Sequence, residues 1–420
     1  MDDVSLPDWV TQADSTDCSK SFHSFMRMAA QNAFMNVMVQ EVASLCGPAY
    51  HPATNSKHQR AGSAPGYYLF GTEEFSIRKP RVRKDGEEVR LKSYVAAQNR
   101  DELRNAMLRA FMANVSTRDQ KPLFKEVSGT SRSEVSRLWK NEGLKFIEQL
   151  RSRDLSESSY LVLMLDGIGL GDDLCAIVAL GITEQGEKHI LDFQIGASEN
   201  REACSDLLHR IEERGFCPRH RLLAVTDGSK ALRSSLRKKW PAVIIQRCLI
   251  HKERNIKGYI SRRHYGELHR LFTRLRKAQG IKAAEECLAD LRRFLRNKNE
   301  EALNSLEKAG DELLAVHSLE VPSTLNRTLL NTNCIENPFR NVRAKIGRVK
   351  RWRPETDMAG KWLAYALLTA EKGFRRIAHY EDLKQLAERL KDLSTPPPEE
   401  GLEKASPSTL DSKPQGAYNP

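Results

Sequence analysis

Short apolar runs between residues 160 and 247 constrain the fold of this 420-residue chain more than any other feature. Runs of this kind are typical of strands that are buried in a sheet. They occupy residues 161–166, 174–182, 189–195, 222–226 and 243–246. Helical periodicity follows the third run and again follows the fourth. Three neighbouring strands followed by alternating helix and strand predict an α/β fold in which helices cover a mixed sheet.

The first and fourth runs each end on an Asp-Gly pair, at Asp166 and Asp227. An Asp-Gly pair after a strand is most often a simple turn. Carboxylates at neighbouring strand ends, however, supply the oxygen ligands that Mg²⁺ prefers, and two such ions can activate water and stabilise the leaving oxygen of a phosphodiester. Glu336 opens a predicted helix and offers a third carboxylate, although a Glu at that position can serve only to complement the helix dipole.

The chain is basic, and its positive charge is concentrated. Its 67 Lys and Arg residues exceed its 55 Asp and Glu residues, which gives a net charge of +12. Charge of this sign favours a polyanionic partner, most commonly nucleic acid, over a purely solubilising role. Residues 252–298 hold 14 basic and 5 acidic residues, and residues 340–353 hold seven basic residues and no acidic one. Such segments can follow a phosphate backbone, while the first would also suit a solvated helical face.

Composition excludes several classes of protein. No apolar run reaches the roughly 18 residues of a membrane-spanning helix, and the start Met1-Asp2-Asp3 lacks the basic and apolar stretches of a secretory signal. Eight cysteines without a CxxC pair argue against a disulfide scaffold and fit a reducing compartment. We therefore expect a cytoplasmic protein that has no membrane partner.

The regions around the predicted sheet differ in character. We expect a polar leader and a helix in residues 1–57, and the first part of the sheet core in residues 151–251. Residues 252–325 are predicted to form an all-helical insertion, and residues 326–393 the C-terminal helices of the core. Residues 394–420 begin with a Pro-rich stretch, stay polar, and are predicted to be a disordered tail.

Residues 58–150 are predicted to hold a DNA-binding region. Residues 47–66 read as a loop and residues 67–83 as an extended segment. Helical periodicity starts at Asp101, and a short second helix is expected at about 118–127.

Ser131 is predicted to cap a third helix, with Glu134 completing a capping box. A helix, a turn containing Gly, and a helix that exposes Arg132 and Arg137 form the layout of a helix-turn-helix. A plain three-helix bundle would give the same pattern, so the sequence leaves the two alternatives open.

Several motifs carry a resemblance to a known family. The most specific are PAVIIQRCLIHKERN at residues 241–255 and Asn331-Thr332-Asn333-Cys334-Ile335-Glu336, and the others are Arg60-Ala61-Gly62, Pro80-Arg81-Val82-Arg83 and Thr226-Asp227-Gly228-Ser229-Lys230. Over residues about 58–376 the chain resembles the Mutator-type transposases, a family of bacterial insertion-sequence enzymes. The spacing fits as well, with 61 residues from Asp166 to Asp227 and 109 from there to Glu336.

The resemblance implies an RNase-H-like core whose catalytic triad is Asp166, Asp227 and Glu336. These residues would hold two Mg²⁺ or Mn²⁺ ions, cut DNA at the terminal inverted repeats of an insertion sequence, and join the freed 3′ end to target DNA. Because two DNA ends must meet, we expect a homodimer or a larger assembly on double-stranded DNA. The alternative is a catalytically inactive, transposase-derived repressor that only binds DNA.

Basic residues near the predicted triad and in the helix-turn-helix are the expected DNA contacts. They are Arg132, Arg137, Lys252, Arg254, Lys257, Arg340, Arg343, Lys345 and Arg348.

Cys248 and His251 form a CxxH pair inside the most specific motif. Two ligands do not complete a tetrahedral zinc site. We therefore expect the pair to have a structural role, or to contact DNA near the cut, and not to bind zinc.

Overall fold

The computed structural model describes residues 15–51, 56–124, 127–197, 200–347, 351–353 and 356–394, with the side chains of residues 15–21 left aside. The chain divides into two compact units. One consists of residues 1–148 and 353–365, and the other of residues 149–352 and 366–420. The predicted tail lies outside the described residues from position 395 onward.

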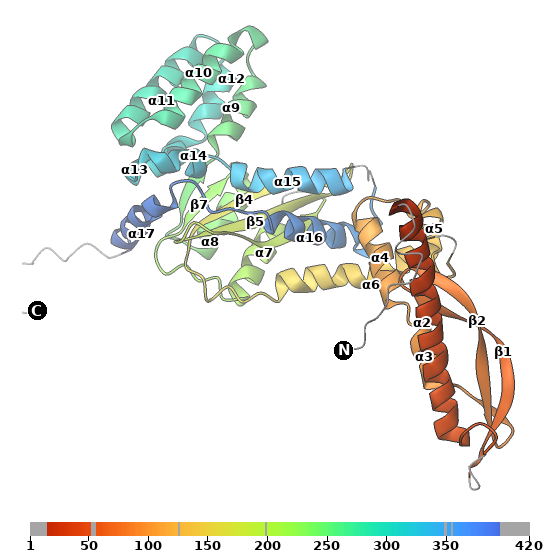
Figure 1. Ribbon diagram of the computed structural model, residues 1–420. Coiled ribbons are helices and arrows are strands. Elements are labelled where there is room, and N and C mark those ends of the chain that lie inside the picture. The colour runs from red at the N-terminus through yellow and green to blue at the C-terminus, as the bar shows by residue number, and fades with distance from the viewer. Residues whose placement is uncertain are drawn as a thin grey trace, which may run out of the picture. The chain divides into compact units, whose positions relative to one another are not determined.

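A long helix packed on a hairpin begins the first unit (Figure 1). The elements are α2 (Ser15–Cys46), β1 (His58–Phe70), β2 (Glu73–Lys84), β3 (Glu87–Val89) and α3 (Lys92–Ala97), and the three strands form an antiparallel sheet in the order β1-β2-β3. The predicted loop at residues 47–66 is wrong in its second half. The pairing of β1 with β2 extends as far as His58 opposite Lys84, so the ladder of hydrogen bonds makes residues 58–66 a strand that their own composition does not indicate.

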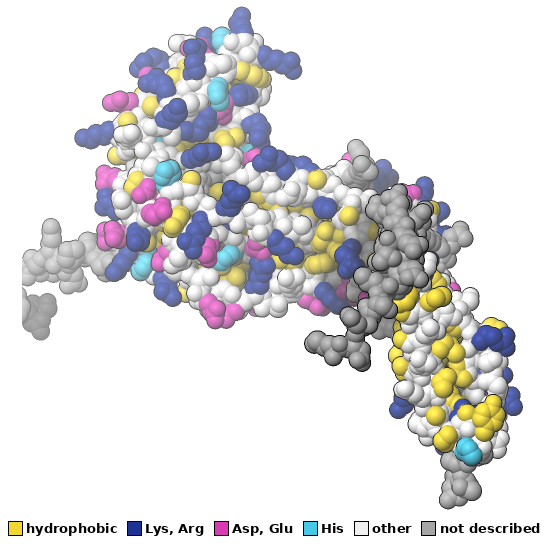
Figure 2. Space-filling model, in the orientation of Figure 1, with side chains coloured by type: hydrophobic (Ala, Val, Ile, Leu, Met, Phe, Trp, Pro, Cys, Tyr) yellow, Lys and Arg dark blue, Asp and Glu magenta, His cyan; other side chains and the backbone are white. Residues whose placement is uncertain are grey.

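The two halves of α2 differ in burial. Met38 and Val42 are buried against Tyr68 of the hairpin. Toward the N-terminal end, Phe22 and Met28 are exposed, and hydrophobic side chains gather on this unit in Figure 2.

Three helices follow: α4 (Asp101–Met112), α5 (Gln120–Leu123) and α6 (Arg132–Arg151). The predicted cap is confirmed, because the Ser131 hydroxyl accepts a hydrogen bond from the Glu134 backbone N–H at 3.2 Å. Val135 and Trp139 are buried on the inner face of α6. The middle helix is a single turn and is shorter than the predicted span of 118–127.

The second unit contains a five-stranded sheet, and all five predicted strands are confirmed. The strands are β4 (Tyr160–Gly169), β5 (Cys175–Thr183), β6 (Lys188–Gly196), β7 (Leu223–Thr226) and β8 (Ile244–Arg247), in the order β6-β5-β4-β7-β8. β4, β5 and β6 are antiparallel neighbours, whereas β7 runs parallel to β4 and β8 parallel to β7.

The pairing of β4 explains where Asp166 lies. The parallel pairing with β7 ends at Leu165 opposite Thr226. The antiparallel pairing with β5 continues to Gly169, so the prediction that this strand ends at Asp166 is wrong. Asp166 therefore lies within β4, beside the point where the neighbouring strand β7 ends and Asp227 follows.

Helices cover the sheet. α7 (Arg201–Glu213) and α8 (Lys230–Lys239) pack on one face, where Leu163 and Leu165 join their hydrophobic core. Because side chains alternate along a strand, Asp166 points to the other face. There α15 (Asn333–Ile346) contacts β4.

The predicted helical segment is present and begins slightly earlier, at Leu249. It contains α9 (Leu249–Lys257), α10 (Tyr265–Lys277), α11 (Gly280–Arg296), α12 (Glu300–Glu307), α13 (Ala315–Ser318) and α14 (Asn326–Leu329). After α15 come α16 (Met358–Glu371) and α17 (Leu383–Asp392).

A helix that began at Glu336, as the sequence predicted, would place Pro338 in its first turn. Because α15 already begins at Asn333, the proline occupies its second turn, where its missing N–H removes a helical hydrogen bond. The helix nevertheless continues to Ile346, with Phe339 and Val342 buried.

None of the helices in the described part of the chain has the length and apolar character needed to cross a membrane.

Candidate active site

Asp166 is a buried carboxylate with few partners. Its side chain accepts a hydrogen bond from the Gly167 backbone N–H at 2.9 Å, and the residue is only 4% exposed. Burial, followed by the nearby negative charge of Asp227, raises the pKa of Asp166 to about 7, against the weaker opposing effect of hydrogen bonds from Gly167 and Thr332. A carboxyl with this pKa gains free energy when a cation replaces the proton, so its environment suits a metal ligand.

Glu336 reaches the same place from α15. Its neighbours Ile335 and Phe339 are buried and anchor the helix. The Oε1 atom of Glu336 is buried and has no hydrogen-bond partner within the described residues. A buried carboxylate oxygen that makes no hydrogen bond is costly, because it has lost its bound water and has no donor in its place.

His251 faces Glu336 and is held by a polar cluster of Cys248 and Thr332. Its Nε2 lies 3.5 Å from Glu336 Oε1, and its Nδ1 lies 3.3 Å from the Thr332 hydroxyl. Cys248 is fully buried, caps α9 by accepting the His251 backbone N–H at 3.5 Å, and accepts the Thr332 hydroxyl at the same distance. The predicted near-site pair is thus part of the wall of this site.

The charges of this cluster are coupled. Hydrogen bonding to Cys248 raises the pKa of His251, and burial opposes that rise. For the Cys248 thiol, burial alone would raise the pKa, but the hydrogen bonds and charge of His251 outweigh it and lower the pKa.

One set of groups in the described residues has the geometry to hold a metal ion. It consists of Asp166, His251 and Glu336, whose ligand atoms all lie within 4.8 Å of one another. Two carboxylates and an imidazole are a suitable donor set for a divalent cation. Oε1 of Glu336 makes no hydrogen bond within the described residues, and such a cation would satisfy it. Asp227 is not in this set, although its charge acts on Asp166.

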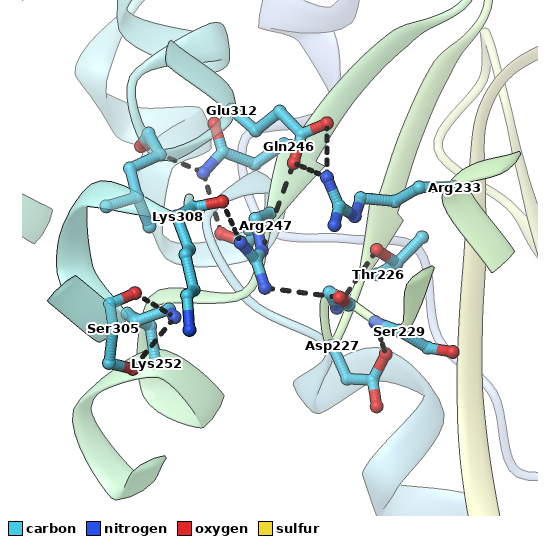
Figure 3. A network of polar contacts seen from close by, with 12 residues as sticks. Thr226, Asp227, Ser229, Arg233, Gln246, Arg247, Lys252, Ser305, Lys308 and Glu312 are labelled. Carbon is cyan, nitrogen blue, oxygen red and sulfur yellow. Dashed lines mark hydrogen bonds and ion pairs between the residues drawn. The ribbon is translucent and has the colours of Figure 1, made fainter. Parts of the chain in front are cut away.

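Asp227 lies in a turn that is fixed by hydrogen bonds from the Arg247 side chain (Figure 3). Its Oδ1 accepts the Ser229 backbone N–H at 2.9 Å, and Gly228 between them has a φ of +98°, which few residues other than glycine adopt. Arg247 donates to the Gly228 carbonyl at 3.1 Å and to the Lys308 carbonyl at 3.0 Å.

The same network ties the turn to the helical segment. Glu312 accepts hydrogen bonds from Arg233 at 3.0 and 3.2 Å and lies 3.9 Å from Arg247 Nε. Burial, followed by the charge of Arg233, lowers the pKa of Arg247. The sequence did not single out Arg247 for a role. The only available signal was its place in the most specific motif, as the last residue of β8.

Lys252 is placed differently from its prediction as a phosphate contact. It is buried, and its Nζ donates to the Ser305 carbonyl at 2.8 Å (Figure 3). Burial and the charges of Arg247, Arg233 and Lys308 lower its pKa to about 8. Lys252 therefore connects α9 to α12 and offers no ammonium to a ligand at the surface.

The other predicted DNA contacts have more suitable positions. Arg340 and Arg343 are exposed on α15, and Lys345 is partly exposed; Arg348 lies outside the described residues. On α9, Arg254 is exposed, whereas Lys257 pairs with Glu253 at 2.7 Å.

Arg132 and Arg137 are exposed on α6, and Arg137 pairs with Glu134 at 2.8 Å. Figure 2 shows Lys and Arg side chains spread over the visible face of the α9–α12 segment.

Comparisons with known proteins agree with the resemblance in the sequence. The sequence pattern of the family described as "Transposase, Mutator family" matches residues 4–376. A transposase for insertion sequence element IS905 from Lactococcus lactis is 26% identical over 76% of this chain and 82% of its own length. A transposase for element IS6120 from Mycolicibacterium smegmatis is 27% identical over 62% of this chain and 81% of its own length. The transposase of IS256 in transposon Tn4001 from Staphylococcus aureus is 30% identical over 49% of this chain and 54% of its own length.

Proposed function

Since the chain belongs to the Mutator family of transposases, we propose that it cuts and joins DNA at the terminal inverted repeats of an insertion sequence, with Asp166, Asp227 and Glu336 as its catalytic carboxylates. The observation that carries the proposal is the convergence of Asp166 and Glu336 on one face of the sheet, close enough to Asp227 for its charge to raise the pKa of Asp166. The strand order, three antiparallel strands followed by two parallel ones, supports an RNase-H-like core for this unit.

Two Mg²⁺ or Mn²⁺ ions would supply the charge that stabilises the attacking and leaving oxygens of a phosphodiester. Asp166 and Glu336 would bind one of the two ions, and Asp227 would bind the other. The rigid turn around Gly228 keeps the Asp227 carboxylate in one orientation, which lowers the cost of reorganisation during the reaction. No covalent intermediate on the protein is required, because positioning and electrostatics carry the reaction.

Basic side chains would bring the DNA to this site. Arg340 and Arg343 project from the helix that carries Glu336, so a phosphate backbone along α15 would pass the carboxylates. Arg132 and Arg137 on α6 would read bases in the terminal repeat if helices α4 to α6 act as a helix-turn-helix. We propose a homodimer or larger assembly, since two ends must be joined to one target.

Cleavage and binding should separate in the carboxylate variants. We expect Asp166→Asn, Asp227→Asn and Glu336→Gln to abolish Mg²⁺-dependent 3′-end cutting of labelled terminal-repeat DNA while leaving its binding intact, since each removes a charge from the site and no phosphate contact. Asp173→Asn, an exposed carboxylate in the loop after β4, is the control and should cut normally. Full cutting by any of the three site variants would contradict the proposal, as would DNA binding by the wild type with no cutting in either Mg²⁺ or Mn²⁺.

A further inference from the structure

His251 occupies a place that the catalytic carboxylates alone do not explain. Its Nε2 belongs to the same compact set of ligand atoms as Asp166 and Glu336, whereas Asp227 does not. Building on the proposed function, we propose that His251 Nε2 is a ligand to the divalent cation held by Asp166 and Glu336, so that this ion has a nitrogen donor. Asp227 then belongs to the opposite side of the site.

The orientation of the imidazole ring is fixed in the way a metal ligand requires. A ligating histidine typically uses its second nitrogen for a hydrogen bond that sets the tautomer and the angle of the ring. Here Nδ1 lies 3.3 Å from the Thr332 hydroxyl, and Thr332 is fully buried. The backbone N–H of His251 is in turn held by Cys248 Sγ, which fixes the start of α9. With Nδ1 engaged, Nε2 is the nitrogen that remains for the site.

The distance between Nε2 and its partner is longer than that of a direct ion pair. Glu336 Oε1 is 3.5 Å away, and this buried oxygen makes no hydrogen bond within the described residues. A simple ion pair of the two groups would be expected to close to about 2.8 Å. Two ligands at about 2.1 Å from one ion lie about 3.0 Å apart when they are at right angles and about 4.2 Å apart when they are opposite each other. The 3.5 Å between His251 Nε2 and Glu336 Oε1 falls within this range.

A nitrogen donor has a consequence for the choice of metal. Imidazole binds first-row transition ions such as Mn²⁺ better than it binds Mg²⁺, whereas carboxylates bind both kinds of ion. Removing the imidazole should therefore weaken Mn²⁺ binding more than Mg²⁺ binding. A histidine that only fills space or pairs with Glu336 would affect both ions alike.

The direct test is spectroscopic and does not depend on activity. Mn²⁺ bound to the full-length protein is examined by electron spin echo envelope modulation, which detects a ¹⁴N nucleus bonded to the ion. The variants are His251→Asn, His251→Gln and Asp166→Asn, with His209→Asn on the exposed face of α7 as the matched control, and each is checked for folding by its thermal melt. We expect ¹⁴N modulation in the wild type and in the control, and its loss in both His251 variants. The Kd for Mn²⁺ should rise about tenfold or more, and the Kd for Mg²⁺ less than about threefold.

The outcomes separate the two proposals. Mn²⁺ bound without ¹⁴N modulation in the wild type, or modulation that persists in a folded His251 variant, overturns the histidine ligand and leaves the carboxylate site standing, provided that Asp166→Asn loses the ion. Equal Mn²⁺ binding by the wild type and Asp166→Asn, or no bound Mn²⁺ in the wild type, overturns the carboxylate site as well.

Discussion

Asp166 and Asp227 follow the same pattern in the sequence and have opposite surroundings in the structure. Asp166 lies within β4, and Asp227 directly follows its parallel neighbour β7. Each precedes a glycine. Asp166 is buried next to other acidic groups, and its pKa rises to about 7. Asp227 is half-buried in a turn that Arg247 fixes, with Arg233 and Glu312 behind it.

The difference shows how one site can combine affinity with precise geometry. Asp166 stores unfavourable electrostatic energy that a cation can relieve, so it contributes to affinity. Asp227 has its orientation set by neighbours that belong to the helical segment, so it contributes to geometry. If this comparison is right, removing the charge of the first residue stabilises the metal-free protein, and removing the supports of the second destabilises it.

The largest effect is expected at Arg247. Arg247→Met should lower the free energy of unfolding by about 3–5 kcal/mol, since it leaves the carbonyls of Gly228 and Lys308 without their buried donor. Urea denaturation measures this loss. Arg237→Met is the control, because Arg237 also contacts Glu312 but is 57% exposed, and its change should stay below about 1 kcal/mol. Equal losses in the free energy of unfolding of the two variants would show that Arg247 has no special role in holding the turn.

The next effect has the opposite sign and depends on pH. At about pH 4 and below, Asp166 is protonated in the folded chain and about half protonated or more in the unfolded chain, so stability is little affected. As the pH rises, the unfolded chain ionises first because the folded pKa is about 7, so stability falls until the pH passes that value. At about 1.4 kcal/mol per pKa unit, the loss at pH 8 is at most about 4 kcal/mol.

Asp166→Asn should therefore raise the melting temperature of the EDTA-treated protein at pH 8 and leave it unchanged at pH 4. Thermal melts across this range measure the effect. A variant that is less stable than the wild type at pH 8 would show that Asp166 is not under electrostatic strain.

A smaller effect is expected from Gly228→Ala. The added methyl group would collide with the Arg247 guanidinium, and the φ of +98° is unfavourable for alanine, so the free energy of unfolding should fall by about 1–3 kcal/mol. Gly169→Ala is the matched control, because a methyl group there meets nothing within 4 Å. If both substitutions cost the same, the turn after Asp227 is not rigid.

Asp227→Asn should change stability least, by less than about 1 kcal/mol without metal. The asparagine oxygen can still accept the Ser229 N–H, and the residue is half-buried. Thermal melts at pH 8 compare it directly with Asp166→Asn. A stabilisation as large as that of Asp166→Asn would erase the difference between the two aspartates.

The sheet was predictable because its strands are buried on both faces and therefore appear as apolar runs. The start of β1 was not, since residues 58–66 contain Gly, Pro and polar residues, and only their pairing with β2 makes them a strand.

The site was predictable for its carboxylates and less so for its supports. Asp166 and Asp227 each close an apolar run before a glycine, and Glu336 lies in a recognisable motif. The burial of Lys252 depends on a carbonyl of Ser305, 53 residues away in the chain, and the placement of Thr332 beside His251 depends on a contact across 81 residues. Contacts of that range leave no local pattern in the sequence.

Whether the three carboxylates line one site is tested directly by cleavage of the protein backbone by Fe²⁺ bound in place of Mg²⁺, with ascorbate and peroxide. Radicals formed at the ion cut only the nearby chain. Asp166, Asp227 and Glu336 are predicted to line one active site that holds two cations, so cuts should fall near residues 166, 227 and 336 and disappear when Mg²⁺ is added in excess. Cuts that omit the segment around Asp227, or that persist unchanged in excess Mg²⁺, would contradict a shared site.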